Sequence, residues 1–163
     1  MPGPEPRLRI AAAPRRSQAD AERLSAHRLA RGVTRALGAL GFATLPEFSF
    51  NNGRRVDVIA VGADGEIIIV EIKTSVADYR ADRKWTDYLE FCDRFYFAVP
   101  ADFPFGLLPE DCGLLVADDY GAVIQRPAPL QVLHTGRRRA QTLRLAHAAM
   151  LRLGRLLDPD AEF

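Results

Sequence analysis

The stretch VDVIAVGADGEIIIVEIK, residues 56–73, decides the fold that this sequence predicts. Two apolar runs flank the turn signal Gly62-Ala63-Asp64-Gly65, which is typical of a β-hairpin. Three charged residues, Asp57, Glu71 and Lys73, stand among the Val and Ile residues. Burying an unpaired carboxylate is strongly unfavourable, so these charges need either partners or a function.

The spacing of the hairpin brings the two carboxylates together. If the hairpin is centred on Asp64, Asp57 lies opposite Glu71. Side chains alternate along a strand, so Lys73 shares their face. Opposed residues have Cβ atoms about 4.5–5.5 Å apart, at which distance two carboxylates repel each other. A divalent cation removes that repulsion, and Mg²⁺ is commonly held by one or two carboxylates with water and phosphate oxygens.

A purely structural explanation is also open at this point. Asp57 could pair with Lys73 at the end of the strand, and Glu71 could pair with Arg54 or Arg55. Ion pairs of this kind also perturb carboxylates without any function. Spacing alone does not decide between a metal site and ion pairs.

Outward from the hairpin, the sequence predicts the order α-β-β-β-α-β-β-β-α. Helices are predicted at 17–41, within 78–92 and at 135–157, and strands at 42–50, 55–61, 66–73, 94–99, 113–117 and 122–125. Ser17 or Asp20 can cap the first helix, and Gly41 can end it. The fold class is therefore α/β, with a mixed central sheet flanked by helices.

Both terminal helices carry an apolar stripe at helical spacing. In the first helix the stripe is Ala26, Leu29, Val33, Leu37 and Leu40. In the last helix it is Leu143, Ala146, Met150, Leu153 and Leu157. The two patterns predict amphipathic helices at both ends of the domain.

The chain has 163 residues, which indicates one domain, at 17–163, after a flexible Pro- and Arg-rich tail at 1–16. No apolar run is long enough to span a membrane, and the N-terminus lacks the apolar core of a signal peptide. We therefore expect a cytoplasmic protein with no membrane partner. Cys92 and Cys112 are too few for a disulfide framework, so we expect two reduced, partly buried thiols.

Charge is distributed unevenly although the net charge is only +1. Arginines load the first third and the C-terminal end, whereas the acids concentrate in the middle. This pattern suits a polyanion held over a metal site, but the charge pattern alone favours ordinary solvated helix faces. Of the 22 basic residues only Lys73 and Lys84 are lysines. Lys73 thus hints that a compact ammonium, rather than a guanidinium, is needed there.

The motif resembles a known superfamily. An Asp on one strand, followed by Glu-x-Lys on the next, after a helix that bears a Glu, is similar to the PD-(D/E)xK nucleases with their restriction-endonuclease-like core of α-β-β-β-α-β order. The longer run RRVDVIAVGADGEIIIVEIKTSVADYRADRKWTDYLEFCDRFYFAVP, residues 54–100, resembles the MmcB-like DNA repair proteins. One departure is Val56, which stands where the superfamily name has Pro.

The resemblance implies a Mg²⁺- or Mn²⁺-dependent DNA endonuclease that hydrolyses phosphodiester bonds. It implies that Asp57 and Glu71 are metal ligands, together with the backbone carbonyl of Ile72. Lys73 would position or activate the attacking water and stabilise negative charge in the transition state.

Further residues receive roles only through the resemblance. Glu22 would be the first-helix acid near the metal, and Glu47 is a rival for that position. Residues that would contact DNA phosphate or support the site from behind are Lys84, Arg54, Arg55 and Trp85. For Lys84 and Trp85 the alternative is an ordinary core helix with a charged outer face.

The expected partner is DNA, recognised by its structure rather than its sequence, because backbone contacts carry no base information. Many nucleases of this fold pair up to cut two strands, so a homodimer is also compatible with the resemblance. Two other interpretations stay open. One is a repair factor that binds DNA or a partner without cleavage, and the other is a structural protein in which the acids form only salt bridges.

Overall fold

The computed structural model describes residues 17–81 and 84–160, and within them the chain has the predicted α/β class. The helical elements are α1 (Gln18–Ala39), α2 (Val76–Ala81), the 3-10 helices η1 (Lys84–Phe91) and η2 (Phe105–Leu107), and α3 (Thr135–Leu157). The strands are β1 (Ala43–Ser49), β2 (Arg55–Val61), β3 (Ile67–Ile72), β4 (Arg94–Val99), β5 (Gly113–Ala117) and β6 (Ala122–Arg126). The tail predicted at 1–16 lies outside the described residues.

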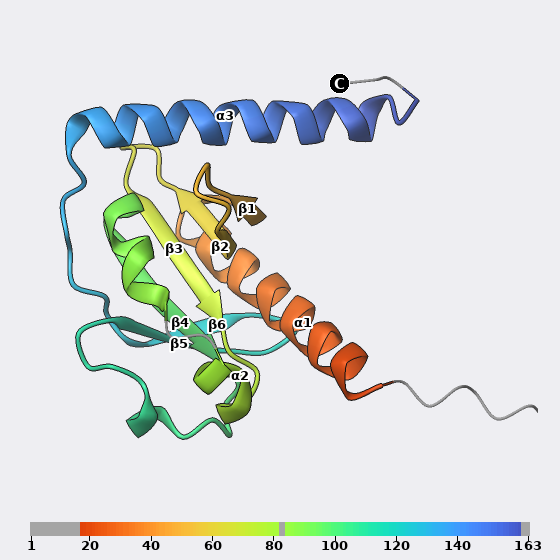
Figure 1. The fold of residues 1–163 in the computed structure, drawn as a ribbon, viewed down its shortest axis with the longest axis vertical. Coiled ribbons are helices and arrows are strands. Elements are labelled where there is room, and N and C mark those ends of the chain that lie inside the picture. The colour runs from red at the N-terminus through yellow and green to blue at the C-terminus, as the bar shows by residue number, and fades with distance from the viewer. Residues whose placement is uncertain (1–16, 82–83, 161–163) are drawn as a thin grey trace, which may run out of the picture.

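The strands form one mixed sheet in the order β1-β2-β3-β4-β5-β6 (Figure 1). The β1–β2, β2–β3 and β5–β6 pairs are antiparallel, and β3–β4 and β4–β5 are parallel. The hairpin register predicted from the sequence is confirmed from Val61↔Ile67 to Val58↔Val70. Every residue of β3 is buried, as expected for a strand with helices on both faces of the sheet.

Helix α1 covers one face of the sheet. Its residues Leu29, Val33 and Leu37 are buried against the inward side chains of β2 to β5. The Ser17 side chain caps the helix by accepting from the Asp20 N–H, and Gly41 ends it with φ of 88°. The apolar stripe is confirmed except at Leu40, which is 59% exposed because it lies at the helix end, beyond the sheet.

The opposite face is covered by α2, η1 and α3. Tyr88 of η1 and Leu145 of α3 belong to the same buried cluster as Ile59, Ile69 and Phe97 of the sheet. The single helix predicted within 78–92 is wrong, because the segment forms α2 and then η1. The break lets α2 pack at the carboxyl end of β3 while η1 packs along β3 and β4.

Helix α3 is fixed to the sheet by a buried carboxylate. Asp93 is 2% exposed and accepts two hydrogen bonds from the Arg138 guanidinium, each at 2.7 Å. It also accepts from the backbone N–H groups of Ile67 and Leu133, each at 2.8 Å. All four donors point at one buried charge, so this contact satisfies that charge and sets the position of the start of α3.

Two further expectations concern the surface and the thiols. No helix within residues 17–81 and 84–160 has the length and apolar character to cross a bilayer. The cytoplasmic location stays a prediction. Cys92 and Cys112 are both free and buried, as predicted.

Candidate active site

The candidate site begins where the ladder between β2 and β3 stops. The last paired residues at this end are Val58 and Val70, one step before Asp57 and Glu71. Beyond them the Asp57 side chain replaces the backbone of β2 as the partner of β3, because its Oδ2 accepts a hydrogen bond from the Ile72 backbone N–H at 2.7 Å. Because a strand residue directs its N–H and C=O to the same neighbour, the Ile72 carbonyl also lies on the Asp57 side of β3.

Glu71 and Lys73 continue the row of Ile67 and Ile69 along β3, on the face that Phe97 of β4 shares. Glu71 lies beside Phe97 of β4, and the Lys73 backbone N–H continues the parallel pairing by donating to the Ala98 carbonyl at 2.9 Å. The Lys73 Nζ lies 3.8 Å from Glu71 Oε2. The two residues are 4% and 5% exposed, so this pair of charges is held in a largely dry environment.

The environment of Asp57 disfavours its charged form. Burial raises the pKa of the Asp57 carboxyl, and the nearby Asp78 carboxylate raises it further. The Ile72 N–H, the Lys73 ammonium and the Arg55 guanidinium act in the opposite direction, but the pKa stays above its ordinary value. A cation beside Asp57 would therefore relieve an existing electrostatic cost.

Asp78 is a site residue that the sequence did not single out. Its Oδ2 accepts from the Thr74 N–H at 2.9 Å, and the Ser75 hydroxyl accepts from the Asp78 N–H at 3.1 Å. These bonds cap α2 directly after the motif and hold the Asp78 carboxylate where it acts on Asp57. The sequence signal was the spacing Ser75-x-x-Asp78, which is typical of a helix start.

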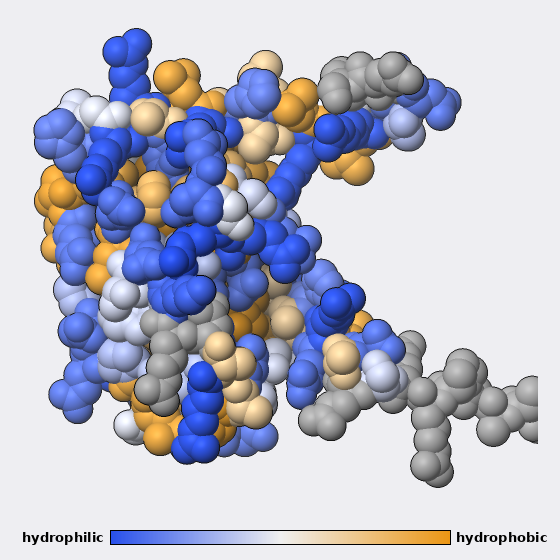
Figure 2. Space-filling view, viewed as in Figure 1, coloured by the Kyte–Doolittle hydropathy of each residue, from blue (hydrophilic) through white to orange (hydrophobic). Residues whose placement is uncertain are grey.

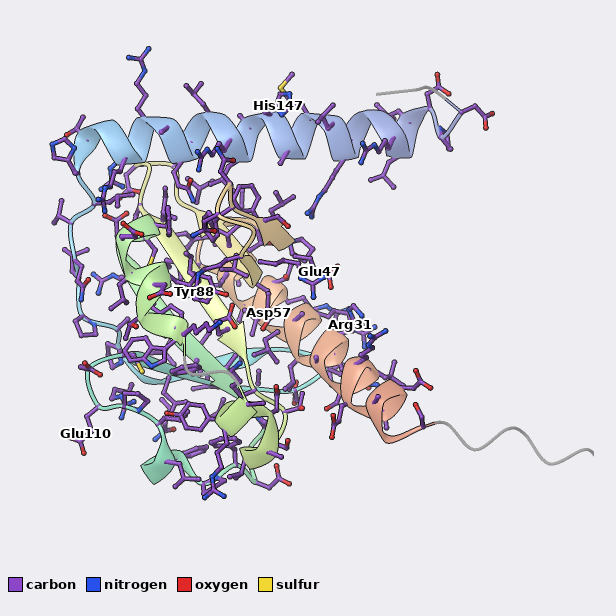
Figure 3. All side chains as sticks on the ribbon, viewed as in Figure 1. Arg31, Glu47, Asp57, Tyr88, Glu110 and His147 are labelled. Atoms are coloured by element: carbon purple, nitrogen blue, oxygen red, sulfur yellow. The ribbon has the colours of Figure 1, made fainter. Side chains whose placement is uncertain are left out.

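Aromatic residues wall the site on the β4 side. Trp85 of η1 lies edge-on to Phe97 with ring centroids 5.8 Å apart, and Phe97 is the sheet neighbour of Glu71. The Tyr88 hydroxyl donates to the Arg55 carbonyl at 3.1 Å and so joins η1 to the start of β2, beside Asp57 (Figure 3). Trp85 thus packs on the sheet neighbour of Glu71, whereas Lys84 is exposed at the start of η1. A role of either residue in the site stays a prediction.

The ion-pair alternative is supported in part, because the Lys73 ammonium acts on the Asp57 carboxyl. Arg54 pairs with Asp87 of η1, and Arg55 lies 3.6 Å from Glu47. Glu71 lies beside Lys73. Arg55 is 59% exposed, so its pair with Glu47 is open to solvent.

Glu22 and Glu47 are the two acids that the sequence offers as a further ligand near the motif. Glu22 is exposed near the start of α1. Glu47 lies on β1 with a positive φ of 49°, where it pairs with Arg55. A metal-ligand role for Glu22 stays a prediction.

The donor set fits a hard divalent cation. Asp57 and Glu71 offer carboxylate oxygens, and Ile72 offers a carbonyl oxygen, which are the donors that Mg²⁺ and Mn²⁺ prefer. Among residues 17–81 and 84–160 no group of three or more His, Cys, Asp or Glu side chains is arranged to hold an ion. A pair of carboxylates with backbone oxygens would suit Mg²⁺ better than Zn²⁺, which prefers nitrogen and sulfur ligands.

Comparison with known proteins identifies relatives of the chain. The model of a family described as DNA repair protein MmcB-like matches residues 11–160. A solved structure described as a protein of unknown function from Silicibacter pomeroyi is 47% identical, with a TM-score of 0.82 over 85% of this chain and 95% of that one.

A second solved structure, a repair endonuclease from Pyrococcus abyssi, is 21% identical over 59% of this chain and 42% of that one, with a TM-score of 0.33. No curated protein matches the chain.

Proposed function

The chain belongs to the MmcB-like family of DNA repair proteins, and from this premise we propose that it is a Mg²⁺- or Mn²⁺-dependent DNA endonuclease. The observation that carries the proposal is the gathering of Asp57, Glu71 and Lys73 at the opened end of the β2–β3 hairpin. A buried site with two carboxylates and one ammonium matches the needs of phosphodiester hydrolysis.

In this reaction a water oxygen forms a bond to phosphorus while the bond from phosphorus to one sugar oxygen breaks. A bound Mg²⁺ supplies Lewis acidity and a more acidic water. Asp57 and Glu71 would hold it, with the Ile72 carbonyl on the same side of β3. The Asp57 carboxylate is kept in place by the Ile72 N–H, so little reorganisation is needed on binding.

Lys73 has the role of a fixed positive charge. Its ammonium stands within 3.8 Å of Glu71, on the face where a phosphate beside the carboxylates would lie. Low exposure strengthens its interaction with negative charge that develops on the phosphate oxygens. Asp78 acts indirectly, because its charge makes the Asp57 environment more favourable for a cation.

DNA would be recognised by its backbone and shape. The exposed arginines of α1, among them Arg23 and Arg35, provide charge for phosphate contacts without base readout. Arg55 and Lys84, both exposed near the site, are further candidates for phosphate contacts.

The test is nicking of end-labelled branched and linear DNA in the presence of Mg²⁺. Wild-type protein should nick, chelation should stop nicking, and Lys73→Met should reduce the rate by about a hundredfold or more. Circular dichroism and a metal titration of the Lys73→Met protein serve as controls for folding and for metal binding. Nicking that survives chelation, or that is unchanged in Lys73→Met, would contradict the proposed site.

A second candidate is a repair factor that binds DNA without cutting it. The burial of Glu71 and Lys73, at 4% and 5% exposed, favours this candidate, because a phosphate must reach them for cleavage. The same assay separates the two functions. DNA retention without nicking, in both the wild type and Lys73→Met, would establish the binding function in place of the enzyme.

A further inference from the structure

Helix α3 presents its main apolar stripe away from the domain. The inner face of α3 is formed by Gln141 and Leu145, which are buried, by Ala148, which packs on the core, and by Arg152, which donates to the Glu47 carbonyl at 2.7 Å. These four residues recur at spacings of three and four, so they form one side of the helix. The predicted stripe lies on the other side.

This outer stripe consists of Leu143, Ala146, Met150, Leu153 and Leu157. Its four large members are 62%, 72%, 55% and 77% exposed, in chain order. Apolar residues gather along the outer side of α3 in Figure 2, and Figure 1 shows the C-terminal half of α3 extending past the sheet. A continuous exposed apolar stripe of this kind is typical of an interaction surface.

The outer stripe has the period of a coiled coil. Leu143, Met150 and Leu157 are spaced by seven residues, and so are Ala146 and Leu153. This is the a/d pattern by which one helix packs against another in a shallow crossing. The stripe therefore fits a second helix as its occupant.

Charges at the two ends of the outer stripe indicate that the second helix is α3 of another copy of the protein. Arg139, seven residues before Ala146, continues the stripe at its N-terminal end. Asp158 and Asp160 follow directly after its C-terminal end, and both are exposed. A second copy in antiparallel orientation would place Arg139 near these aspartates, whereas a parallel copy would oppose like charges. Antiparallel helix dipoles favour the same orientation.

The sides of the outer stripe carry no acid or arginine between its first and last residues. They are formed by Thr142, His147, Ala149 and Gly154. Arg144 and Arg155 stand at helical spacing with Gln141 and Ala148, on the inner side of α3. An acidic partner helix or an anionic membrane would require basic residues beside the stripe. The sides of the stripe lack them, so both partners are less suited than a second copy.

The free edge of the sheet, strand β1, is blocked against pairing with a further strand where α3 contacts it. β1 is an edge strand, but Pro46 lacks an N–H, and Arg152 donates to the carbonyls of Pro46 and Glu47. These features protect the edge from strand addition. We infer that α3 is the dimerisation element, and that two copies pack their outer stripes antiparallel with Met150 near the twofold axis.

Sedimentation equilibrium of the full chain tests this inference without metal or DNA. Wild type should be a reversible dimer, and Met150→Glu should raise the dissociation constant by about a hundredfold or more, because it buries a charge at the axis. The matched control is Leu156→Glu. Leu156 is 78% exposed on the same helix. It lies four residues after Arg152, on the side of the inner face, and so lies outside the outer stripe. Leu156→Glu should change the dissociation constant of the dimer by only a few-fold.

A wild type that stays monomeric at about 0.1 mM would overturn the inference. So would a Met150→Glu protein that dimerises as well as wild type, or a Leu156→Glu protein that is disrupted equally. Circular dichroism of each variant confirms that α3 is still formed, so loss of dimer is not mistaken for loss of fold.

Disulfide trapping tests the orientation. In an antiparallel dimer Leu143 of one copy faces Leu157 of the other, so a mixture of Leu143→Cys and Leu157→Cys proteins should give a mixed disulfide. The native Cys92 and Cys112 are buried and should not compete. Cross-linking of each variant only with itself would indicate a parallel pair and would contradict the proposed arrangement.

Discussion

The Asp57 carboxylate accepts the backbone N–H of Ile72 at 2.7 Å, at the point where the backbone pairing of β2 and β3 has already ended. A side chain thus replaces a strand partner. This opens the hairpin at its charged end and holds one carboxylate oxygen, while the other stays available to a ligand. The relationship explains how acids can stand in an apolar hairpin without destroying it.

Replacing Asp57 with Asn should separate function from stability. Asn keeps an acceptor for the Ile72 N–H but has no charge, so it removes the cost of a buried carboxylate whose pKa is raised by burial. We expect metal binding and nicking to be lost. We also expect the free energy of unfolding, measured in urea without divalent metal, to rise by about 1 kcal/mol.

The matched variant is Asp57→Ala, which removes the acceptor as well as the charge. It should be less stable than Asp57→Asn by about 1 kcal/mol, because the Ile72 N–H loses its hydrogen bond. Equal stability of the two variants would show that this hydrogen bond does not hold the hairpin end.

Asp93 should dominate the acid sensitivity of the fold. Burial alone would raise the pKa of its carboxyl, but hydrogen bonds from Arg138 and from the N–H groups of Leu133 and Ile67 hold it below its ordinary value of 3.8. The stabilisation is therefore fully present above pH 3.8 and is lost as pH falls through the lowered pKa.

Asp93→Asn should cost about 3–5 kcal/mol at about pH 7, because it leaves the Arg138 guanidinium without its charged partner. Urea denaturation of wild type and Asp93→Asn at several pH values measures the difference. The difference should shrink only below pH 3.8. A difference that is constant across the acid range would contradict the assignment to this carboxylate.

The close approach of α1 to the β5–β6 turn depends on Gly32. A Cβ at this position would overlap the Asp118 and Gly121 carbonyl oxygens, which are backbone atoms that cannot move aside cheaply. We expect Gly32→Ala to destabilise the protein by about 2–4 kcal/mol. The control is Gly38→Ala in the same helix, where nothing lies within 4 Å of the added Cβ.

The control should be neutral or stabilising by about 0.5–1 kcal/mol, since Ala favours the helix. Thermal unfolding of both variants gives the comparison. Similar midpoints for Gly32→Ala and Gly38→Ala would show that α1 can shift away from the turn.

The two cysteines should be unreactive while the protein is folded. Burial, together with the neighbouring Asp93 charge, raises the pKa of the Cys92 thiol to about 12. Burial also raises the pKa of Cys112, against the opposing effect of Arg126. Only about one Cys92 thiol in ten thousand is ionised at about pH 8, so iodoacetamide should label the folded protein very slowly and the unfolded protein rapidly. Rapid labelling of the folded protein, read by mass spectrometry, would contradict this environment.

The sequence predicted the hairpin and its register because two features agreed. The Asp64 turn fixed the centre, and period-two alternation required the apolar residues on both faces to pair as they do. The same geometry predicts that Asp57 and Glu71 meet, which stays a prediction. The end of the ladder before Asp57 was not predictable, because it depends on a hydrogen bond made by a side chain.

Two other features lay beyond the sequence pattern. The position of Asp78 depends on hydrogen bonds with Thr74 and Ser75 at the start of α2, which periodicity does not reveal. The sequence predicted that α3 has an apolar face, but periodicity does not tell whether that face packs on the sheet or points away from the domain. The Asp93–Arg138 contact and the packing of Leu145 turn that face outward.

The most direct measurement of the central claim is a calorimetric titration of Mn²⁺ into the wild type, Asp57→Asn and Glu71→Gln proteins, with and without branched DNA. We expect saturable binding of Mn²⁺ by the wild type and loss of this binding in both variants, although both stay folded. Absence of binding by wild type with DNA present, or binding that both variants retain, would contradict a metal site at the end of this hairpin.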